Sequence, residues 1–287
     1  MTLSKFLPPI ASDRQATNED YEYFRIKPIN GALGAEISGL DISEPLDAPQ
    51  IANLREALLN HLVIVFRDQT LSPDRLSSFG QQFGELHINP FVNGVDGVNE
   101  VIEIRSEENN EKRFTGLWHS DISWGETPSM GSVLYAVKIP PYGGDTLFSN
   151  MYLAYETLSP GYKKILEGLN AVHRVDHHEI STVNSNDQPE PVIHPAIRTH
   201  PETGRKALFV NEYFTSQFDG LSEQESRPIL DYLFAHSARP DFTCRIQWQQ
   251  GTVVFWDNRC TMHYATNDYA GQQRLMQRVT INGDKPF

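Results

Sequence analysis

The sequence predicts a mainly β fold with flanking helices, either an antiparallel β-sandwich or a jelly roll. Apolar runs rich in β-branched residues, which are typical of strands, dominate the middle and the end of the chain. Segments in which apolar residues recur at helical spacing lie between these runs. No internal repeat or low-complexity segment is visible, which argues against a solenoid.

The first part of the chain is expected to combine short strands with two helices. Residues 1–24 are polar and irregular and predict a loose N-terminal arm. The glycine-punctuated stretch that follows predicts short strands joined by tight turns. The predicted elements are short strands over 24–41, a helix over 47–60, a buried strand over 61–66, a helix beginning at Ser72-Pro73 and a strand over 101–105.

The rest of the chain is expected to be strand-rich, with one domain over 25–287 and lid-like loops near 84–116 and 173–200. A strand is also expected to carry Trp118-His119-Ser120-Asp121. Pro228 is tolerable only in the first turn of a helix, so that helix should begin near Ser226. The other predicted elements are helical segments over 150–168 broken at Pro160 and strands over 132–138, 206–210, 243–248, 252–256 and 275–281.

Composition and charge narrow the classes of partner. The chain has 287 residues, 39% hydrophobic and 21% charged, which is enough for one large globular domain with a sizeable core. Its formal net charge of -13 argues against nucleic acid, because binding to phosphates requires clustered Lys and Arg. A small anionic substrate would therefore have to be held by local positive groups.

Location is suggested by what the composition lacks. No apolar run approaches ~18 residues, so no membrane span is expected. Residues 1–9 lack the basic and apolar regions of a signal peptide. Cys244 and Cys260 do not suggest a disulfide framework, and we expect a reducing cytoplasm.

The stretch Trp118-His119-Ser120-Asp121 carries the first chemical signal. In a strand, His119 and Asp121 point to the same side. With one distant histidine, His263, they would form a two-histidine, one-carboxylate set with open positions, as in non-haem Fe(II) oxygenases. A lone His-x-Asp is more often an ordinary surface or core feature. Zinc accepts the same ligand types, but it has no redox chemistry.

Several further segments resemble one family. They are Ile139-Pro140-Pro141-Tyr142-Gly143-Gly144-Asp145-Thr146, Thr199-His200-Pro201, Phe209-Val210-Asn211-Glu212, Trp256-Asp257-Asn258-Arg259, His263-Tyr264-Ala265 and the C-terminal residues 274–287. Together with the His-Ser-Asp motif, they make the chain similar to the taurine dioxygenase family of Fe(II)- and 2-oxoglutarate-dependent oxygenases from about Phe24 onward. The resemblance implies a double-stranded β-helix, a jelly roll, in which His119, Asp121 and His263 bind Fe(II).

The resemblance also implies the position of the cosubstrate. Arg274 would clamp the distal carboxylate of 2-oxoglutarate, a pairing that suits the planar guanidinium, and Thr146 would add a hydroxyl hydrogen bond. Arg278 lies four residues after Arg274, so both point to one face of a strand, and Arg278 is expected to meet an anionic substrate. The alternative for Arg278 is a salt bridge to a carboxylate of the protein.

The substrate pocket departs from the taurine-specific enzymes. Asn89 stands where those enzymes hold the sulfonate with a histidine, Val92 replaces a tyrosine, and Thr115 replaces an asparagine. Ile122, Phe214 and Arg278 complete the expected substrate contacts. Adjacent His177 and His178 are expected at a loop surface, while Cys260 and Trp256 are expected to be core residues rather than ligands.

The predicted activity is therefore hydroxylation of a small anionic organic substrate, a sulfonate, sulfate ester or carboxylate, with Fe(II), 2-oxoglutarate and O2 as cofactors and succinate and CO2 as co-products. The alternative is a metal-binding jelly-roll protein without oxygenase activity, which would have no reason to keep Arg274 with Thr146. A metal-assisted hydrolase is less favoured, because no general base is evident beside the ligands. No membrane partner is expected. The protein is expected to form a homo-oligomer, either a dimer or a tetramer.

Overall fold

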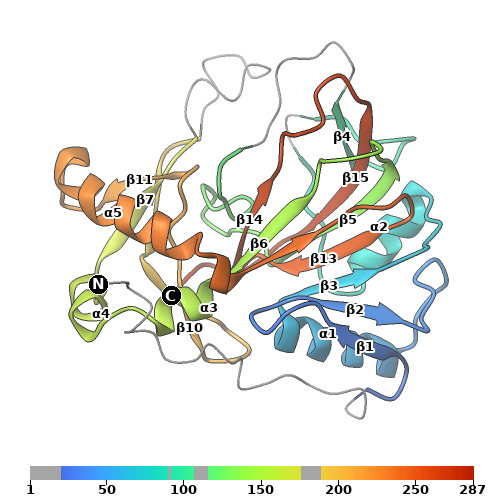
Figure 1. Cartoon of the computed structure of the whole chain (residues 1–287), viewed down its shortest axis with the longest axis horizontal. Helices are drawn as coiled ribbons and strands as arrows, with labels where there is room; N and C mark the ends of the chain where they lie inside the picture. The colour runs from blue at the N-terminus through green and yellow to red at the C-terminus, as the bar shows by residue number, and fades with distance from the viewer. Residues whose placement is uncertain (1–20, 90–91, 107–115, 176–188) are drawn as a thin grey trace.

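The computed structural model describes residues 21–89, 92–106, 116–175 and 189–287. Its largest element is a seven-stranded sheet. Seven strands lie in the order β1-β2-β3-β13-β5-β15-β4 (Figure 1). Strands β2 and β3 pair in parallel, and the other pairs of this sheet are antiparallel. Their bounds are Arg25–Pro28 (β1), Ala35–Ser38 (β2), Val63–Phe66 (β3), Val253–Asp257 (β13), Gly131–Lys138 (β5), Arg274–Ile281 (β15) and Ile102–Ser106 (β4).

A second antiparallel sheet has the order β12-β6-β14, and β14 carries His263. It consists of Thr243–Ile246 (β12), Thr146–Asn150 (β6) and Thr261–Ala265 (β14). Two smaller sheets lie beyond it, β11-β7-β8 and β10-β9. Their strands are Thr215–Phe218 (β11), Asn170–His173 (β7), Val192–Pro195 (β8), Lys206–Leu208 (β10) and Ile197–Thr199 (β9).

The helices begin where the sequence supplies a cap. Asp47 forms a capping box with Gln50 at the start of α1, and Ser72 caps α2 ahead of Pro73. In Figure 1, α1 and α2 cover one face of the large sheet, while α3 and α5 lie toward the smaller sheets. The helices are Ala48–His61 (α1), Pro73–Gln81 (α2), Met151–Glu156 (α3), Pro160–Leu166 (α4) and Glu223–Ser237 (α5), with a 3-10 turn at Pro240–Phe242.

Alternation along the strands divides the core between two faces of the large sheet. On β5, Leu134 and Ala136 belong to the apolar cluster that also contains Phe148 of the second sheet. Val133 and Tyr135 point the other way, into the cluster under α1 and α2. Polar side chains of β14 and β15 can therefore meet in the space between the two sheets.

Two expectations about local structure are wrong. The His-Ser-Asp motif does not lie in a strand: His119 forms one isolated bridge, and a turn begins at Asp121. Helix α5 begins at Glu223 instead of near Ser226, because Ser222 and Glu225 form a capping box three residues earlier. Pro228 then lies inside the helix and only forgoes one backbone hydrogen bond.

One of the two long loops contains more regular structure than expected. Strands β8 and β9 occupy the end of the proposed 173–200 loop, and His173 is the last residue of β7. Within 84–116, strand β4 is present as expected. Residues 1–20 of the predicted arm, 90–91, 107–115 and 176–188, which include Thr115, His177 and His178, lie outside the described residues. No helix in the described part is long and apolar enough to span a bilayer.

Candidate active site

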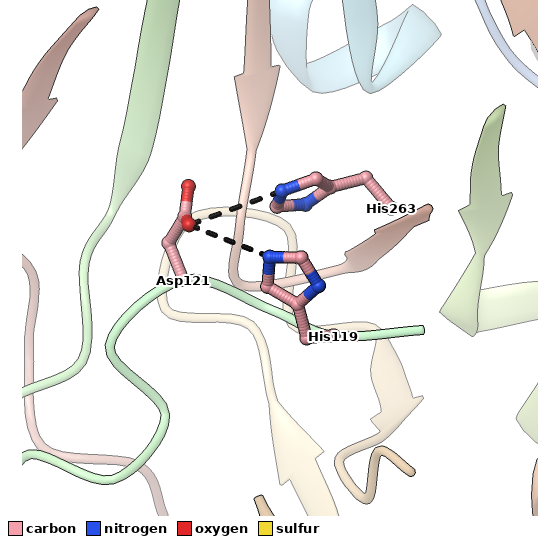
Figure 2. A group of neighbouring side chains, drawn as sticks. All are labelled: His119, Asp121 and His263. Carbon is pink, nitrogen blue, oxygen red and sulfur yellow. Dashed lines mark ion pairs between the residues drawn. The ribbon is translucent and has the colours of Figure 1, made fainter. Parts of the chain in front are cut away.

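Backbone pairing places two histidines face to face. His119 and His263 form an antiparallel bridge, with N–H to carbonyl distances of 3.0 and 2.7 Å. Their ring centroids are 4.1 Å apart. Two residues after His119, the turn brings the Asp121 carboxylate to the same point, as Figure 2 shows. The structure therefore brings together the three residues that the sequence predicted as metal ligands.

A single carboxylate oxygen lies at the centre of this group. Oδ1 of Asp121 is 3.9 Å from Nε2 of His119 and 3.8 Å from Nε2 of His263 (Figure 2). Both distances exceed a hydrogen bond, so the three atoms are not bonded to one another. Two imidazole nitrogens and a carboxylate oxygen that converge without mutual hydrogen bonds are a donor set that suits a divalent transition metal.

The electrostatics leave the donors in their metal-binding forms. Burial lowers the pKa of both histidines, that of His263 to about 3, so each ring is neutral at neutral pH. Nδ1 of His119 lies 3.0 Å from the carbonyl of Leu117; a donated hydrogen bond there leaves the Nε2 lone pair facing Asp121. Burial would raise the pKa of Asp121, but the Arg278 guanidinium, together with a hydrogen bond from Ser132, holds it well below its usual range.

The turn after Asp121 is strained. Ile122 has φ of +55°, a left-handed conformation that is unfavourable for a β-branched residue. Such a conformation costs on the order of 1–3 kcal/mol and persists only where surrounding contacts impose it. Ile122 was predicted to contact substrate; the structure places it, half-buried, directly beside the Asp121 ligand position.

Arg278 contacts the triad itself. Its Nη1 donates to Oδ1 of Asp121 at 3.1 Å. The sequence left open whether Arg278 meets a substrate or a carboxylate of the protein. In the structure it pairs with Asp121, and its Nε has no partner among the described residues.

Arg274, on the same strand, is a buried cation that forms no ion pair within the described part of the chain. Its exposed fraction is 6%, its Nε lacks a hydrogen bond, and no carboxylate of the described chain forms an ion pair with it. The guanidinium lies between the rings of Trp248 and Tyr269, at 5.9 and 5.8 Å. A Cβ on Gly144 would lie 3.2 Å from Nε of Arg274, so glycine keeps this space open. An anionic ligand would supply the missing charge.

Thr146 and Arg274 both contact Trp248. It is the first residue of β6 and is 3% exposed. Its Oγ accepts a hydrogen bond from Nε1 of Trp248 at 3.0 Å, which leaves the hydroxyl proton available to a ligand. Trp248 thus contacts both residues that were predicted to bind 2-oxoglutarate, a role that the sequence did not reveal.

The predicted substrate wall is only partly assembled. Phe214 is buried and edge-on to His119 at 6.1 Å, and the neighbouring Tyr213, which sequence reasoning missed, is 5.4 Å from the same ring. Val92 is 43% exposed rather than part of a closed wall. Asn89 accepts a hydrogen bond from the Val92 amide at 3.2 Å, which shapes this loop.

A second group of metal-type side chains has a different character. His200, Asp257 and Cys260 are buried and converge, but Asp257 already accepts hydrogen bonds from Arg259 and His200. Nδ1 of His200 accepts from the amides of Glu202 and Thr203. Burial raises the pKa of the Cys260 thiol well above its usual value, so it is not a thiolate ligand. This group is a satisfied structural network.

Known proteins are similar to this chain over most of its length. Residues 25–280 match the family model described as taurine catabolism dioxygenase TauD, TfdA family. The chain is 34% identical to an alkylsulfatase of Acinetobacter baylyi, over 92% of this chain and 86% of that protein. It is 30% identical to an alpha-ketoglutarate-dependent 2,4-dichlorophenoxyacetate dioxygenase of Cupriavidus pinatubonensis, over 90% and 97%.

Solved structures show the same architecture. A crystal structure described as a taurine dioxygenase from Burkholderia xenovorans superposes with a TM-score of 0.82 at 37% identity, covering 92% of this chain and 93% of that one. This similarity confirms the jelly-roll prediction.

Proposed function

The chain belongs to the TauD, TfdA family, and from this premise we propose that His119, Asp121 and His263 hold its metal. Members of this family are Fe(II)- and 2-oxoglutarate-dependent dioxygenases, so the protein is an oxidoreductase that uses Fe(II), 2-oxoglutarate and O2. The alternative of a non-catalytic binding protein has no support in these similarities.

One observation carries the assignment of the metal ligands. Oδ1 of Asp121 faces Nε2 of His119 and Nε2 of His263 at 3.9 and 3.8 Å without a hydrogen bond to either. Both rings are neutral and the carboxylate is ionised, which is the protonation state that metal binding requires. Three ligands from the chain leave the remaining positions of the metal to cosubstrate and oxygen.

The cosubstrate is assigned to the buried cation on β15. Arg274 has no carboxylate partner among the residues 21–89, 92–106, 116–175 and 189–287, and a buried guanidinium without one is costly unless an anionic ligand pairs with it. Thr146 can donate its hydroxyl proton to the same ligand because its oxygen is already bonded to Trp248. We assign the distal carboxylate of 2-oxoglutarate to this pair.

When bound, Fe(II) and 2-oxoglutarate supply the oxidising chemistry that converts O2, 2-oxoglutarate and a substrate C–H bond into succinate, CO2 and a hydroxylated product. The residues of the chain bind and orient the substrate and the cosubstrate, and they exclude water. Phe214 and the Tyr213 ring cover His119, and Trp248 with Tyr269 encloses Arg274. This enclosure keeps the charged groups in surroundings where their interactions are strong.

The substrate is proposed to be a small organic anion recognised by Arg278. Two relatives act, by their names, on alkyl sulfates and on an aryloxyacetate, both of which carry one anionic head group on an apolar body. Asn89 cannot carry the positive charge of a histidine, and Val92 adds apolar surface. We therefore expect alkyl sulfates, longer sulfonates and aryloxyalkanoates to be better substrates than taurine.

The test is succinate formation that depends on both 2-oxoglutarate and substrate, across a panel of alkyl sulfates, sulfonates including taurine, and aryloxyalkanoates. Succinate released without substrate gives the uncoupled background. Taurine is included in this panel because a solved relative at 37% identity is described as a taurine dioxygenase. If taurine is turned over best, then Asn89 and Val92 do not determine specificity.

Two broader predictions accompany this function. A cytoplasmic location is suggested by two buried cysteines that form no disulfide, Cys244 and Cys260. A dimer or tetramer is expected, and light scattering of the purified protein would measure it.

A further inference from the structure

The carboxylate of Asp121 uses its two oxygens for different purposes. Oδ1 faces the histidines and Arg278. Oδ2 instead accepts a hydrogen bond of 2.7 Å from the hydroxyl of Ser132 on β5. Ser132 is fully buried, so no water competes for this contact. The orientation of the carboxylate about its last bond is therefore fixed from behind.

Asn258 orients the serine that fixes the carboxylate. Its side-chain Nδ2 donates to the hydroxyls of Ser132 and Ser129, both at 3.0 Å. Because Ser132 accepts from Asn258, its own proton is directed to Asp121. Ser129 in turn donates to the Asp121 carbonyl at 2.9 Å.

The amide of Asn258 is itself held in one orientation. Its Oδ1 accepts from the Trp256 ring nitrogen at 2.9 Å and from the Asp121 amide at 3.3 Å. Its backbone carbonyl accepts from the hydroxyl of Ser120 at 2.7 Å. Asn258 is 1% exposed and Trp256 is also 1% exposed. A buried polar network in which each member is satisfied specifies a single arrangement.

The same asparagine also stands close to the other ligand strand. Asn258 lies in the turn between β13 and β14, five residues before His263. Its neighbours Asp257 and Arg259 form a buried ion pair that anchors this turn. One turn thus connects the position of His263 on β14 with the orientation of Asp121.

We propose that Ser132 and Asn258 are positioning residues that hold Oδ2 of Asp121 and so reserve Oδ1 for the metal. This inference rests on the proposed function, because it requires Asp121 to be a metal ligand. If Ser132 no longer held Oδ2, the carboxylate could rotate or offer both of its oxygens to the metal. A coordination position needed by 2-oxoglutarate or O2 could then be lost. Hydrogen-bond partners of metal ligands commonly matter by about 10–100-fold in metal affinity or activity.

The test is Mn(II) binding to the full-length protein, measured by titration calorimetry without 2-oxoglutarate. Ser132→Ala should weaken Mn(II) binding by about tenfold or more. Ser132→Thr keeps the hydroxyl and should restore most of the affinity. The matched control is Ser226→Ala on α5, which removes another fully buried hydroxyl, one that accepts from the amide of Phe218 on β11. It should leave Mn(II) binding unchanged.

A spectroscopic measurement separates positioning from general stability. The visible charge-transfer band of the anaerobic Fe(II) and 2-oxoglutarate complex should shift or weaken in Ser132→Ala and remain in Ser226→Ala, while thermal unfolding of the metal-free proteins changes similarly in both. If Ser132→Ala does not fold, Ser132→Cys, with a side chain of similar size and a weak donor, should show the same weakening.

The outcomes distinguish the two proposals. If the wild-type protein binds no Mn(II), the metal site itself is wrong, and the positioning role falls with it. If the wild-type protein binds Mn(II) and Ser132→Ala binds it equally tightly with an unchanged band, the metal site stands and the positioning role is overturned.

Discussion

Arg278 donates from Nη1 to Oδ1 of Asp121 over 3.1 Å, and the same oxygen faces both histidines of the site. The side chain of Arg278 remains 19% exposed, whereas that of Asp121 is 6% exposed. The guanidinium is therefore the charged group through which an arriving anion can reach the triad. An anion that binds Arg278 has to compete with Asp121 for it.

Replacement of Arg278 by glutamine should impair the use of anionic substrates. The variant keeps a hydrogen-bonding side chain but loses the charge, and the loss of a partner from a buried charge pair costs about 2–5 kcal/mol. We expect KM for the best anionic substrate to rise by about tenfold or more, since about 1.4 kcal/mol corresponds to tenfold. The measurement is substrate-dependent succinate formation.

The binding of 2-oxoglutarate serves as the control for this variant. Titration of 2-oxoglutarate into the metal-loaded Arg278→Gln protein should give nearly wild-type affinity, because Arg274 is intact. Weaker 2-oxoglutarate binding combined with unchanged use of substrate would mean that the roles of Arg274 and Arg278 are exchanged.

Metal binding should show one site per chain. The group of His119, Asp121 and His263 has donors without mutual hydrogen bonds, whereas the group containing Cys260 is already satisfied internally. Equilibrium dialysis with Fe(II) under anaerobic conditions should give one ion per chain. His263→Ala or Asp121→Ala should abolish binding and the visible band with 2-oxoglutarate.

Cys260→Ala is the matched variant for the second group and should retain the full stoichiometry. Two ions per chain in the wild-type protein, falling to one in Cys260→Ala, would show that the satisfied network binds metal after all. An unchanged visible band in both His263→Ala and Asp121→Ala would remove these residues from the metal site.

The sequence pointed to the proposed metal ligands but not to the residues that support them. His119 and Asp121 are close in the chain, and the family motifs pointed to His263 and Arg274. Ser132 and Asn258 could not be assigned in the same way, because the hydrogen bond between Asp121 and Asn258 spans 137 residues and depends on the packing of several strands. Trp256-Asp257-Asn258-Arg259 was visible as a motif, yet its roles became clear only from these contacts.

The local geometry of the motif also escaped prediction. We expected strand alternation to bring His119 and Asp121 to one side, but a turn containing Ile122 at φ of +55° does so instead. A strained residue of this kind is imposed by its surroundings, and nothing in local propensity signals it. The buried strands β3, β5, β13 and β15 and the capped helix α1, by contrast, follow local rules, and these elements were predicted close to their observed positions.

His61 should make stability depend on pH. Burial lowers its pKa from 6.5 to about 4, and its Nε2 lacks a hydrogen-bond partner among the described residues. Between these two pKa values the unfolded chain binds a proton that the folded chain does not, so this histidine reduces stability as pH falls from about 6.5 to about 4. Its contribution is at most about 3.5 kcal/mol, because one pKa unit corresponds to about 1.4 kcal/mol.

His61→Leu removes this titration with a side chain of similar size. The free energy of unfolding, measured with urea at about pH 7.5 and about pH 5, should fall less in the variant than in the wild-type protein. The gap between the two proteins should therefore widen in favour of the variant as the solution becomes more acidic. If the free energy of unfolding changes in parallel in both proteins, then His61 is protonated or reached by solvent in the folded state.

Arg274→Gln should specifically disrupt the cosubstrate site. Arg274 is buried near the rings of Trp248 and Tyr269 and forms no ion pair with any residue that the structure describes, so the protein without ligand bears the cost of burying this cation. Removing that charge leaves the distal carboxylate of 2-oxoglutarate without its partner and should weaken 2-oxoglutarate binding by about tenfold or more. Because the variant also removes a buried unpaired charge, its thermal unfolding midpoint without ligand should be equal to or higher than that of the wild-type protein. Mn(II) binding should be preserved, since Arg274 forms no contact with the triad. A variant that binds 2-oxoglutarate as tightly as the wild-type protein would contradict the assignment and would direct attention to Arg278 as the clamp.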